Sequence, residues 1–232
     1  MNRPLIFLIS ACGAIFFFIA CHQPSSTSSN PNLTESDSVV NNANADAKQI
    51  KIGNQLWATA NLSVTHFSNG DLIPEANSSA QWEKAGVEGK PAWCYYNQDP
   101  VLGKKYGMLF NWYAVTDKRN IAPRGWHIPD DDEWKILTEF LGEEDAGTKM
   151  KSPVEWKEEG SGANKNGFNG LPGGYRYNNG NFNGLYAYGS FWSNTSFDSS
   201  GAWYRYLGES TKKLTRNYSD KRDGFSVRCI RD

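Results

Sequence analysis

The residue types that most often carry catalysis are sparse in this 232-residue chain and match no known catalytic spacing. It has three histidines, and the two beyond the N-terminal segment, His66 and His127, are far apart in sequence. The motifs HExxH, CxxC and GxSxG, which indicate zinc hydrolases, cysteine pairs and serine hydrolases, are absent. His127 lies between Trp126 and Ile128, a setting typical of a packed or hydrogen-bonded histidine. We therefore predict no catalytic residue, no metal site and no cofactor.

The acidic run from Asp130 to Asp132 has two chemical interpretations, a calcium loop and a helix start. It lacks the spacing and the glycine of a calcium loop. Asp130 is placed to cap a helix, and Glu133 stands at the position that completes a capping box. Apolar residues then recur at helical spacing before Gly142, at Trp134, Leu137 and Leu141. The stretch predicts an amphipathic helix whose acidic first turn suits the positive end of the helix dipole.

The N-terminal segment has the pattern of a secretion signal. Arg3 precedes an apolar run that ends at Ala20, and the run is shorter than the roughly 20 residues that an ordinary membrane-spanning helix needs. The tetrapeptide FIAC resembles a bacterial lipobox, with Phe18 where leucine is usual. The resemblance implies cleavage of a signal peptide, residues 1–20, and acylation of Cys21. An uncleaved anchor and secretion without lipid are the alternatives.

A lipid on Cys21 predicts attachment to the bacterial cell envelope, with the outer membrane favoured and the periplasmic or outer face left open. Residues 21–48 are rich in Ser, Asn and Thr and contain no Phe, Trp or Tyr. Such a segment buries too little apolar surface to offset its conformational entropy, so we expect a flexible tether. Within it the triplet DSV resembles an O-glycosylation motif of Bacteroidota, with Ser38 as acceptor. Residues 49–232 are expected to form one domain.

Charge and aromatic content restrict the partners of this domain. The chain has 24 basic and 25 acidic residues and a formal net charge of −1. Adjacent basic residues in the domain occur only as separate pairs, such as those at 212–213 and 221–222, so a nucleic-acid partner is not expected. Aromatic residues make up 14% of the chain and include nine tryptophans. This content favours a well-filled core and an aromatic surface.

Residue periodicity predicts a mixed α+β domain. Alternation over residues 49–62 predicts an opening strand or hairpin. The stretch NSSAQWEKAG predicts a short helix with Asn77 as N-cap and Gly86 as C-cap, and YGMLFNWYAV favours a second helix. Strands are expected at the C-terminal end, over residues 190–195, 202–207, 213–218 and 224–231.

The stretch from Gly167 to Asn194 combines glycines, asparagines and aromatic residues with one charge, Arg176. Glycines beside aromatic residues let backbone loops approach flat rings and take positive φ. We therefore expect a long loop region that acts as framework, since disordered tracts are poor in aromatics. The five donors of Arg176 suit either a set of loop carbonyls or a ligand carboxylate, and the first interpretation is favoured.

Two cysteines remain in the domain once Cys21 is lipidated. Cys94 and Cys229 form an even pair in a chain expected to be exported, which favours a disulfide. Such a bridge would close a long loop and stabilise the fold by about 4 to 5 kcal/mol.

Six motifs follow one another in an order that resembles the Fibrobacter succinogenes major paralogous domain family. They are PAWCYYNQD, YGMLFNWYAV, PRGWHIPDDDEW, GFNGLPGGYR, FWSNTSFDSSGAWYRYL and GFSVRCIRD. The family occurs in secreted and lipid-anchored bacterial proteins. More distantly, NWYAV followed by GWHIPDDDEW is similar to the helix pair of the C-type lectin-like fold, as in formylglycine-generating enzymes. The resemblance implies a C-type lectin-like α+β domain with two main helices on small antiparallel sheets, long Gly, Asn and aromatic loops, and chain ends close together.

The resemblance leaves two functions open, and fold alone does not decide between them. One is a non-catalytic surface module that binds a glycan or protein. The other is an enzyme related to formylglycine-generating oxidases, whose copper-binding cysteine pair would correspond here to Cys94 and Cys229. The missing catalytic set, the tether and the lipid anchor favour the module. The EPN, QPD and WND triplets of calcium-dependent lectins are absent, so sugar binding through calcium is not implied.

The C-terminal strands are also similar to the ligand-binding end of retroelement-diversified proteins with that fold. Alternation in AWYRYL sends Trp203 to the core and Tyr204 and Tyr206 to the opposite face. We expect these two tyrosines to form a ligand surface, or merely to cover the sheet. Four further residues complete the set of binding candidates: Tyr218, Asp220, Arg222 and Arg176.

Overall fold

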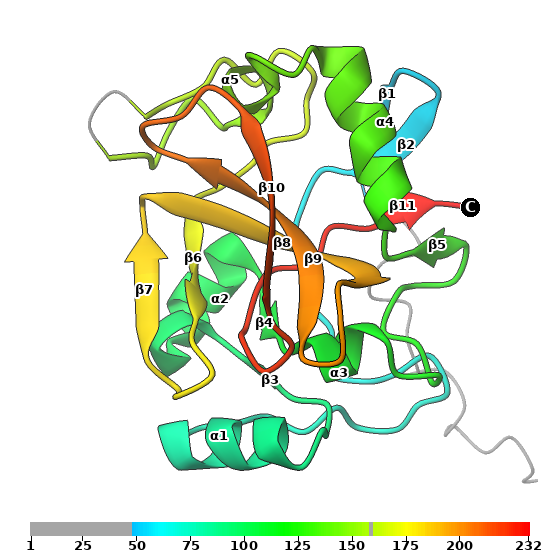
Figure 1. Cartoon of the computed structure of the whole chain (residues 1–232), viewed down its shortest axis with the longest axis vertical. Helices are drawn as coiled ribbons and strands as arrows, with labels where there is room; N and C mark the ends of the chain where they lie inside the picture. The colour runs from blue at the N-terminus through cyan, green and yellow to red at the C-terminus, as the bar shows by residue number, and fades with distance from the viewer. Residues whose placement is uncertain (1–47, 158–159) are drawn as a thin grey trace, which may run out of the picture. The chain divides into compact units, whose positions relative to one another are not determined.

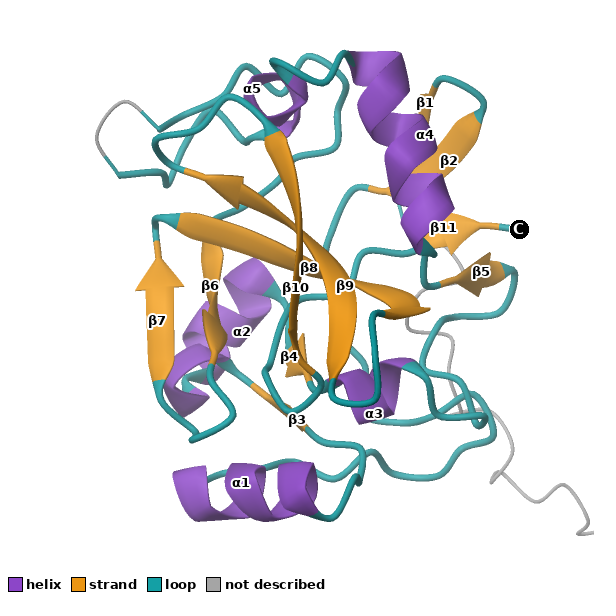
Figure 2. Ribbon diagram, viewed as in Figure 1, coloured by secondary structure: helices purple, strands orange, loops and turns teal. Residues whose placement is uncertain are grey.

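The computed structural model describes residues 48–157 and 160–232, which belong to one unit, Val39–Asp232 (Figures 1 and 2). The signal peptide, Cys21, Ser38 and nearly all of the predicted tether lie outside the described residues. Within the described ranges, none of the helices has the length and apolar character needed to cross a bilayer.

Helices and short strands are interspersed in the first part of the domain and six strands in succession, β6 to β11, end it, as expected for an α+β domain. The helices are α1 (Ser79–Val87), α2 (Pro100–Tyr106), α3 (Trp112–Val115), α4 (Asp131–Leu141) and α5 (Ala146–Met150), with a 3-10 turn η1 (Tyr96–Gln98). The strands are β1 (Gln49–Ile52), β2 (Gln55–Ala58), β3 (Trp93–Cys94), β4 (Leu109–Phe110), β5 (Trp126–His127), β6 (Gly173–Arg176), β7 (Phe182–Leu185), β8 (Tyr188–Ser196), β9 (Gly201–Gly208), β10 (Leu214–Asp220) and β11 (Ile230–Arg231).

A small antiparallel sheet joins the two ends of the domain in the order β1-β2-β11-β5. The predicted opening hairpin is confirmed, and Gly53 makes its turn with a φ of 60°. Ile230 lies opposite both Trp57 and His127, so β11 fits between β2 and β5 (Figure 1). Arg231 Nη1 donates to Gln49 Oε1 at 3.3 Å. The first and last described strands therefore lie close together.

The larger sheet has five strands in the order β10-β9-β8-β6-β7. Its neighbours are antiparallel except β6 and β8, which run parallel through the pair Gly174 and Gly189. The strands predicted at 190–195, 202–207 and 213–218 are confirmed. The one predicted over 224–231 is mostly wrong: only Ile230–Arg231 is a strand, because the preceding residues make isolated bridges to several different strands.

Helix α4 follows its sequence signal closely. Asp130 accepts from Glu133 N at 2.8 Å, and the Glu133 carboxylate accepts from Asp130 N at 2.9 Å, which confirms the capping box. The predicted apolar face is buried, at Trp134, Leu137 and Leu141. Trp134 packs on Trp57 of β2 with ring centroids 4.7 Å apart. This helix thereby covers one end of the small sheet and contacts the larger one.

Two other helix predictions need correction. Helix α1 is capped by Ser78, which accepts from Gln81 N, and not by Asn77; its C-cap is Glu88 and not Gly86. The second predicted helix is only the short α3. Its cap, Asn111, is buried and accepts from Ala114 N, so the residues before it extend into β4.

The stretch from Gly167 to Asn194 is framework, but it contains β6 and β7 where loops were expected, besides most of the predicted strand β8. Gly174 has a φ of 68°, and a Cβ there would lie 2.5 Å from Tyr96 Cε2 and 2.7 Å from Asn183 O. Only glycine fits this position. The close approach packs β6 against β7 and η1.

The predicted disulfide is wrong, since Cys94 and Cys229 are both free and buried. Cys94 packs in a cluster with Trp82 and Tyr96, whereas Cys229 packs in the separate cluster that contains Phe110. An even number of cysteines permits a bridge but does not place two strands next to each other. Burial raises the pKa of the Cys94 thiol to about 11 and that of Cys229 to about 12.

Candidate functional site

Five tyrosines converge on one face of the larger sheet and form what we call the tyrosine pocket, with a volume of about 290 Å³. β9 lies between β8 and β10, so its outward side chains meet neighbours from both strands. Tyr206 is opposite Ser190 on one side, and Tyr204 is opposite Asn217 on the other. The lining residues are Tyr175, Tyr177, Tyr188, Ser190, Tyr204, Tyr206, Asn217, Ser219, Asp223 and Phe225.

Most neighbouring rings stand at steep angles to one another, while those of Tyr204 and Tyr206 are stacked at 29°. Tyr188 and Tyr206 have centroids 5.9 Å apart and an interplanar angle of 64°. Tyr175 meets Tyr188 at 6.1 Å and 71°, and meets Tyr177 at 5.1 Å and 89°. The hydroxyls of Tyr175 and Tyr177 are 3.1 Å apart and share a hydrogen bond. Rings at such angles form walls, so they enclose a recess instead of covering the sheet with a flat layer.

The floor of the pocket is continuous with the core. Phe225 is buried, and its ring centroid is 4.5 Å from that of Tyr204. Burial raises the pKa of Tyr204 to about 12 and raises that of Tyr175 as well. Both phenols therefore stay protonated at neutral pH and can donate hydrogen bonds. Tyr177 and Tyr188 are 40% and 37% exposed, which leaves their outer edges free for contact with a ligand.

One carboxyl group lies at the pocket wall. Asp223 is 6% exposed and accepts from Asn178 N at 2.7 Å and from Ser219 Oγ at 2.6 Å. Burial raises its pKa to about 6 in spite of these hydrogen bonds. Each carboxylate oxygen accepts one bond in the described structure and retains a second lone pair. The pocket thus combines aromatic walls with a small set of polar groups.

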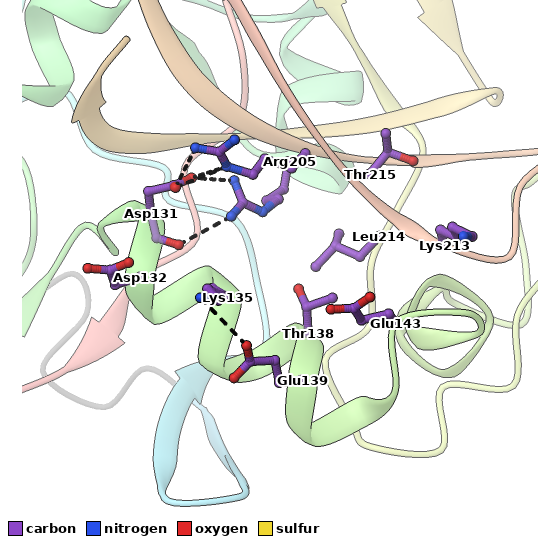
Figure 3. Close-up of a pocket in the computed structure, with 11 residues that line it drawn as sticks. Asp131, Asp132, Lys135, Thr138, Glu139, Glu143, Arg205, Lys213, Leu214 and Thr215 are labelled. Carbon is purple, nitrogen blue, oxygen red and sulfur yellow. Dashed lines mark hydrogen bonds and ion pairs between the residues drawn. The ribbon is translucent and has the colours of Figure 1, made fainter.

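A second recess, the charged groove, lies between α4 and the β9–β10 hairpin and has a volume of about 620 Å³ (Figure 3). At its inner end Asp131 is held by two arginines. Arg205 Nη1 donates to Asp131 Oδ1 at 2.7 Å, and Arg216 Nη2 donates to Asp131 Oδ2 at 2.8 Å. Burial alone would raise the pKa of Asp131, but these hydrogen bonds lower it below its usual range. The groove is larger than the tyrosine pocket, and the charge of Asp131 at its inner end is balanced by Arg205 and Arg216.

The predicted ligand residues divide between the two faces of the hairpin. Tyr204 and Tyr206 line the tyrosine pocket, as the alternation predicts. Tyr218 lies opposite Trp203 and therefore on the other face. There it stacks on Phe197 with centroids 4.0 Å apart and an interplanar angle of 18°. It is not a lining residue of either recess.

Trp203, expected in the core, is instead half-buried. The Arg216 guanidinium lies 3.2 Å from the centroid of its indole ring, and Phe197 contacts it edge-on at 4.8 Å. The neighbouring buried residue on this strand face is Arg205. The alternation therefore predicted the two faces correctly. It was wrong to place Trp203 in the core, because the buried side chain is that of Arg205.

Asp220 and Arg222 bind each other beside the pocket. Arg222 Nε donates to Asp220 Oδ1 at 2.9 Å, and Asn178 Nδ2 donates to Asp220 Oδ2 at 3.1 Å. Neither residue lines the tyrosine pocket. Their pairing fixes the turn after β10, which in turn places Asp223.

Arg176 is fully buried, so its assignment as a ligand candidate is wrong and the structural interpretation is right. Its guanidinium donates to Gly180 O and Ala76 O at 3.0 Å each. It lies between the rings of Trp82 and Phe182, 4.7 Å and 4.6 Å from their centroids. These contacts join α1 to the β6–β7 hairpin.

Eight of the ten lining residues were not among the predicted candidates, and four of these contribute most to the site: Tyr175, Tyr177, Tyr188 and Asp223. The first two flank buried Arg176, and this polar and aromatic alternation is a strand signal within a stretch that was expected to be loop. Nothing local marks the other two. Tyr188 is placed by the parallel pairing of β6 and β8, and Asp223 by the turn after β10.

No group of three or more His, Cys, Asp and Glu side chains in residues 48–157 and 160–232 is arranged to hold a metal ion. His127 is hydrogen-bonded, as expected: its Nε2 is 2.8 Å from Glu133 Oε1 and its Nδ1 is 2.7 Å from Asp232 Oδ1. Partial burial would lower the pKa of His127, but the two carboxylates outweigh it and raise the pKa. The histidine ties α4 to the end of the small sheet.

Comparisons with known proteins bear on the whole domain. Searches of curated proteins and of solved structures gave no match. A family model described as the Fibrobacter succinogenes major domain matches residues 50–231, which include every helix of the described structure and nearly all of its strand residues. The chain therefore belongs to the Fibrobacter succinogenes major domain family.

Proposed function

We propose that the domain is a non-catalytic binding module that takes one unit of a glycan into the tyrosine pocket. The observation that carries the proposal is the pocket itself, in which five tyrosines and a few polar groups converge. Aromatic faces stack on the apolar faces of sugar rings, while phenol, amide and hydroxyl groups bind their hydroxyls. Ligand sites typically combine apolar walls with a small number of placed polar groups.

The size of the pocket favours a glycan unit over a folded protein partner. Its volume of about 290 Å³ is near the lower end of the range for small-molecule sites, about 300–1,000 Å³. A stable protein interface buries about 800 Å² on each partner, far more than such a recess offers. A protein would reach it only through a single side chain.

The enzymatic alternative receives less support. An oxidase using Cys94 and Cys229 requires reactive thiolates that share a metal ion. Both thiols are buried in separate clusters, and burial raises their pKa to about 11 and about 12. They are protonated at neutral pH. We therefore interpret both as packed core residues.

The C-type lectin-like fold and the lipid anchor belong to the same proposal. The pairing of β2 with β11, which joins the two ends of the domain, is consistent with that fold. So are the helices that lie beside small sheets. A lipid on Cys21 would place the pocket at the cell envelope, on a tether formed by residues 21–48. Metabolic labelling with an alkyne fatty acid should tag the wild-type chain and not the Cys21→Ser variant; equal labelling of both would end the anchor proposal.

A glycan array probed with residues 48–232 tests the binding function. We expect Tyr206→Ala to weaken binding of any glycan found by about 1–3 kcal/mol, because the variant removes a pocket wall. Tyr218→Ala is the matched control: it removes a tyrosine from the neighbouring strand on the opposite face and should leave affinity unchanged. No glycan bound, or equal losses in the two variants, would refute the assignment of this pocket.

A further inference from the structure

We propose that the unit bound in the tyrosine pocket carries a positively charged ammonium group, recognised by the aromatic walls and by Asp223. This inference rests on the proposed binding function and specifies the class of its ligand. It starts from the charge of the lining. Of the described residues that line the pocket, Asp223 is the one that is charged at neutral pH.

The basic side chains nearest to Asp223 are already engaged. Arg222 donates to Asp220 through Nε and Nη2. Lys221 Nζ donates to Asp198 O at 2.7 Å, and Arg176 is buried between two rings. The groups that act on the Asp223 carboxyl are therefore Ser219 and Asn178 as hydrogen-bond donors, Asp220 as a like charge and Arg222 as a distant opposite charge. No side chain among the described residues makes an ion pair with it.

A buried carboxylate without an ion-pair partner is costly, and native proteins usually pair such a group. Here the cost appears as the raised pKa of Asp223, about 6. An ammonium ligand would supply the missing charge at the position where the pocket opens onto this group. A neutral sugar would leave the carboxylate as it is.

The aromatic walls favour the same ligand. An ammonium group within about 6 Å of a tyrosine ring centroid is attracted by the negative face of the ring. Tyr188 and Tyr206 meet at 64°, and Tyr175 and Tyr177 meet at 89°, so neighbouring rings present faces in different directions around one space. Ring sets of this kind, with an acid beside them, suit cations held by several faces at once.

The charged groove supplies an internal comparison. Asp131 has two arginines within hydrogen-bond distance, so that acid has no charge left for a ligand. Asp223 has hydrogen bonds from neutral groups only. The buried acid of the tyrosine pocket is thus the one whose charge the fold leaves unbalanced.

An amino sugar and a lysine side chain share this ammonium chemistry, and the experiment separates them. Saturation-transfer NMR on the full chain in a non-ionic detergent would use matched pairs of probes. Choline is compared with its neutral isostere 3,3-dimethylbutanol, glucosamine with glucose, and Nα-acetyl-lysine methyl ester with Nα-acetyl-norleucine methyl ester. The variants are Asp223→Asn, which keeps the shape of the side chain, and Tyr206→Ala, with Tyr218→Ala as control.

We expect choline to bind about tenfold more tightly than its isostere, and Asp223→Asn to remove most of that difference. Binding of the cation should weaken as the pH falls through about 6, where the Asp223 carboxyl takes up its proton. Stronger binding of glucosamine than of lysine ester would identify an amino sugar as the source, and the reverse would identify a side chain. A thermal melt of each variant excludes loss of binding through unfolding.

Two results would overturn the inference. If each neutral probe binds as well as its cationic partner, and Tyr206→Ala weakens both, the pocket binds ligands without regard to charge and only the proposed function survives. If no probe binds, but a glycan from the array binds the wild type and not Tyr206→Ala, the ammonium inference fails and the glycan site stands. Failure of the array and of every probe would refute both.

Discussion

The two faces of the β9–β10 hairpin carry the same kinds of residue and use them in opposite ways. One face bears Arg205 and Arg216, which hold Asp131 between them. The other bears Tyr204 and Tyr206, with Asp223 beside them and no arginine bound to it. The pKa of Asp131 is lowered despite its burial, whereas that of Asp223 is raised to about 6. An acid whose charge is satisfied within the fold contributes to stability, and an acid whose charge is not satisfied remains available for binding.

The aromatic residues follow the same division. On the closed face Arg216 covers Trp203, and Tyr218 stacks on Phe197, so the rings are occupied by their own neighbours. On the open face the tyrosines meet at steep angles around a recess. Composition alone therefore does not distinguish a binding surface from a packed one; the partners of each side chain do.

Removal of Arg205 is expected to have the largest effect. Arg205→Met should lower the free energy of unfolding by about 3–5 kcal/mol, because the Arg205 side chain is 2% exposed and its loss leaves a partly buried carboxylate with a single partner. Arg216→Met is the matched control. It removes the other contact to the same acid, but Arg216 is 46% exposed, so about 1 kcal/mol or less should be lost. Chemical denaturation measures both, and equal losses would contradict the division of the pair into a buried and an exposed member.

The two acids should respond to pH with opposite slopes. The folded-state pKa of Asp223 is raised, so its contribution to stability is present below about pH 4 and is lost as the pH rises through about 6. The difference in unfolding free energy between the wild type and Asp223→Asn should therefore fall by on the order of 2–3 kcal/mol from pH 4 to pH 7. The pKa of Asp131 is lowered, so its contribution is present above its ordinary pKa and is lost as the pH falls. If the contributions of Asp223 and Asp131 to the unfolding free energy changed with pH in the same direction, the charge environments of the two acids would not be distinct.

Tyr204 and Tyr206 should separate in stability although both line the pocket. Tyr204 packs on Phe225 and on buried Trp192, so Tyr204→Ala should cost about 2 kcal/mol of unfolding free energy. Tyr206→Ala should cost under about 1 kcal/mol, since its ring packs on those of Tyr188 and Tyr204, which also line the pocket. Equal melting temperatures in the two variants would contradict this separation.

The smallest expected effect concerns the closed face. A double-mutant cycle with Phe197→Ala and Tyr218→Ala should give a coupling energy of about 0.5–1 kcal/mol, as for stacked rings on a surface. The same cycle on Tyr188 and Tyr206 should give a similar or smaller coupling energy without ligand. The coupling energy should be larger with ligand bound, if the ligand packs against both rings. A coupling near zero on the closed face would mean that its rings do not stabilise one another.

Local signals in the sequence predicted the local parts of the fold. The start of α4 depends on Asp130 and Glu133, three residues apart, and its buried face on a simple period, so both were predictable. The opening hairpin and three C-terminal strands were predictable for the same reason. Helix α3 was overestimated because a buried Asn111 ends β4 with two backbone contacts that no period reveals.

The candidate site was only half predictable. Alternation within β9 placed Tyr204 and Tyr206 on one face, but the other walls come from β6 and β8, which meet through the parallel pair Gly174 and Gly189. That contact depends on the absence of a side chain at Gly189, because a Cβ there would lie 2.5 Å from Leu171 O, just before β6. The disulfide prediction failed for a related reason: an even number of cysteines gives no information about the distance between Cys94 and Cys229.

The position of β11 has a consequence for how the protein is made. Its Ile230 fills the gap between Trp57 of β2 and His127 of β5, so the sheet that begins the domain is completed near its other end. Contacts between residues so distant in sequence must overcome a large loop-closure entropy and slow the folding reaction. During translation the β1–β2 hairpin therefore cannot pair with β11 until residue 230 has been synthesised. The small sheet is therefore completed only after nearly all of the domain has been synthesised.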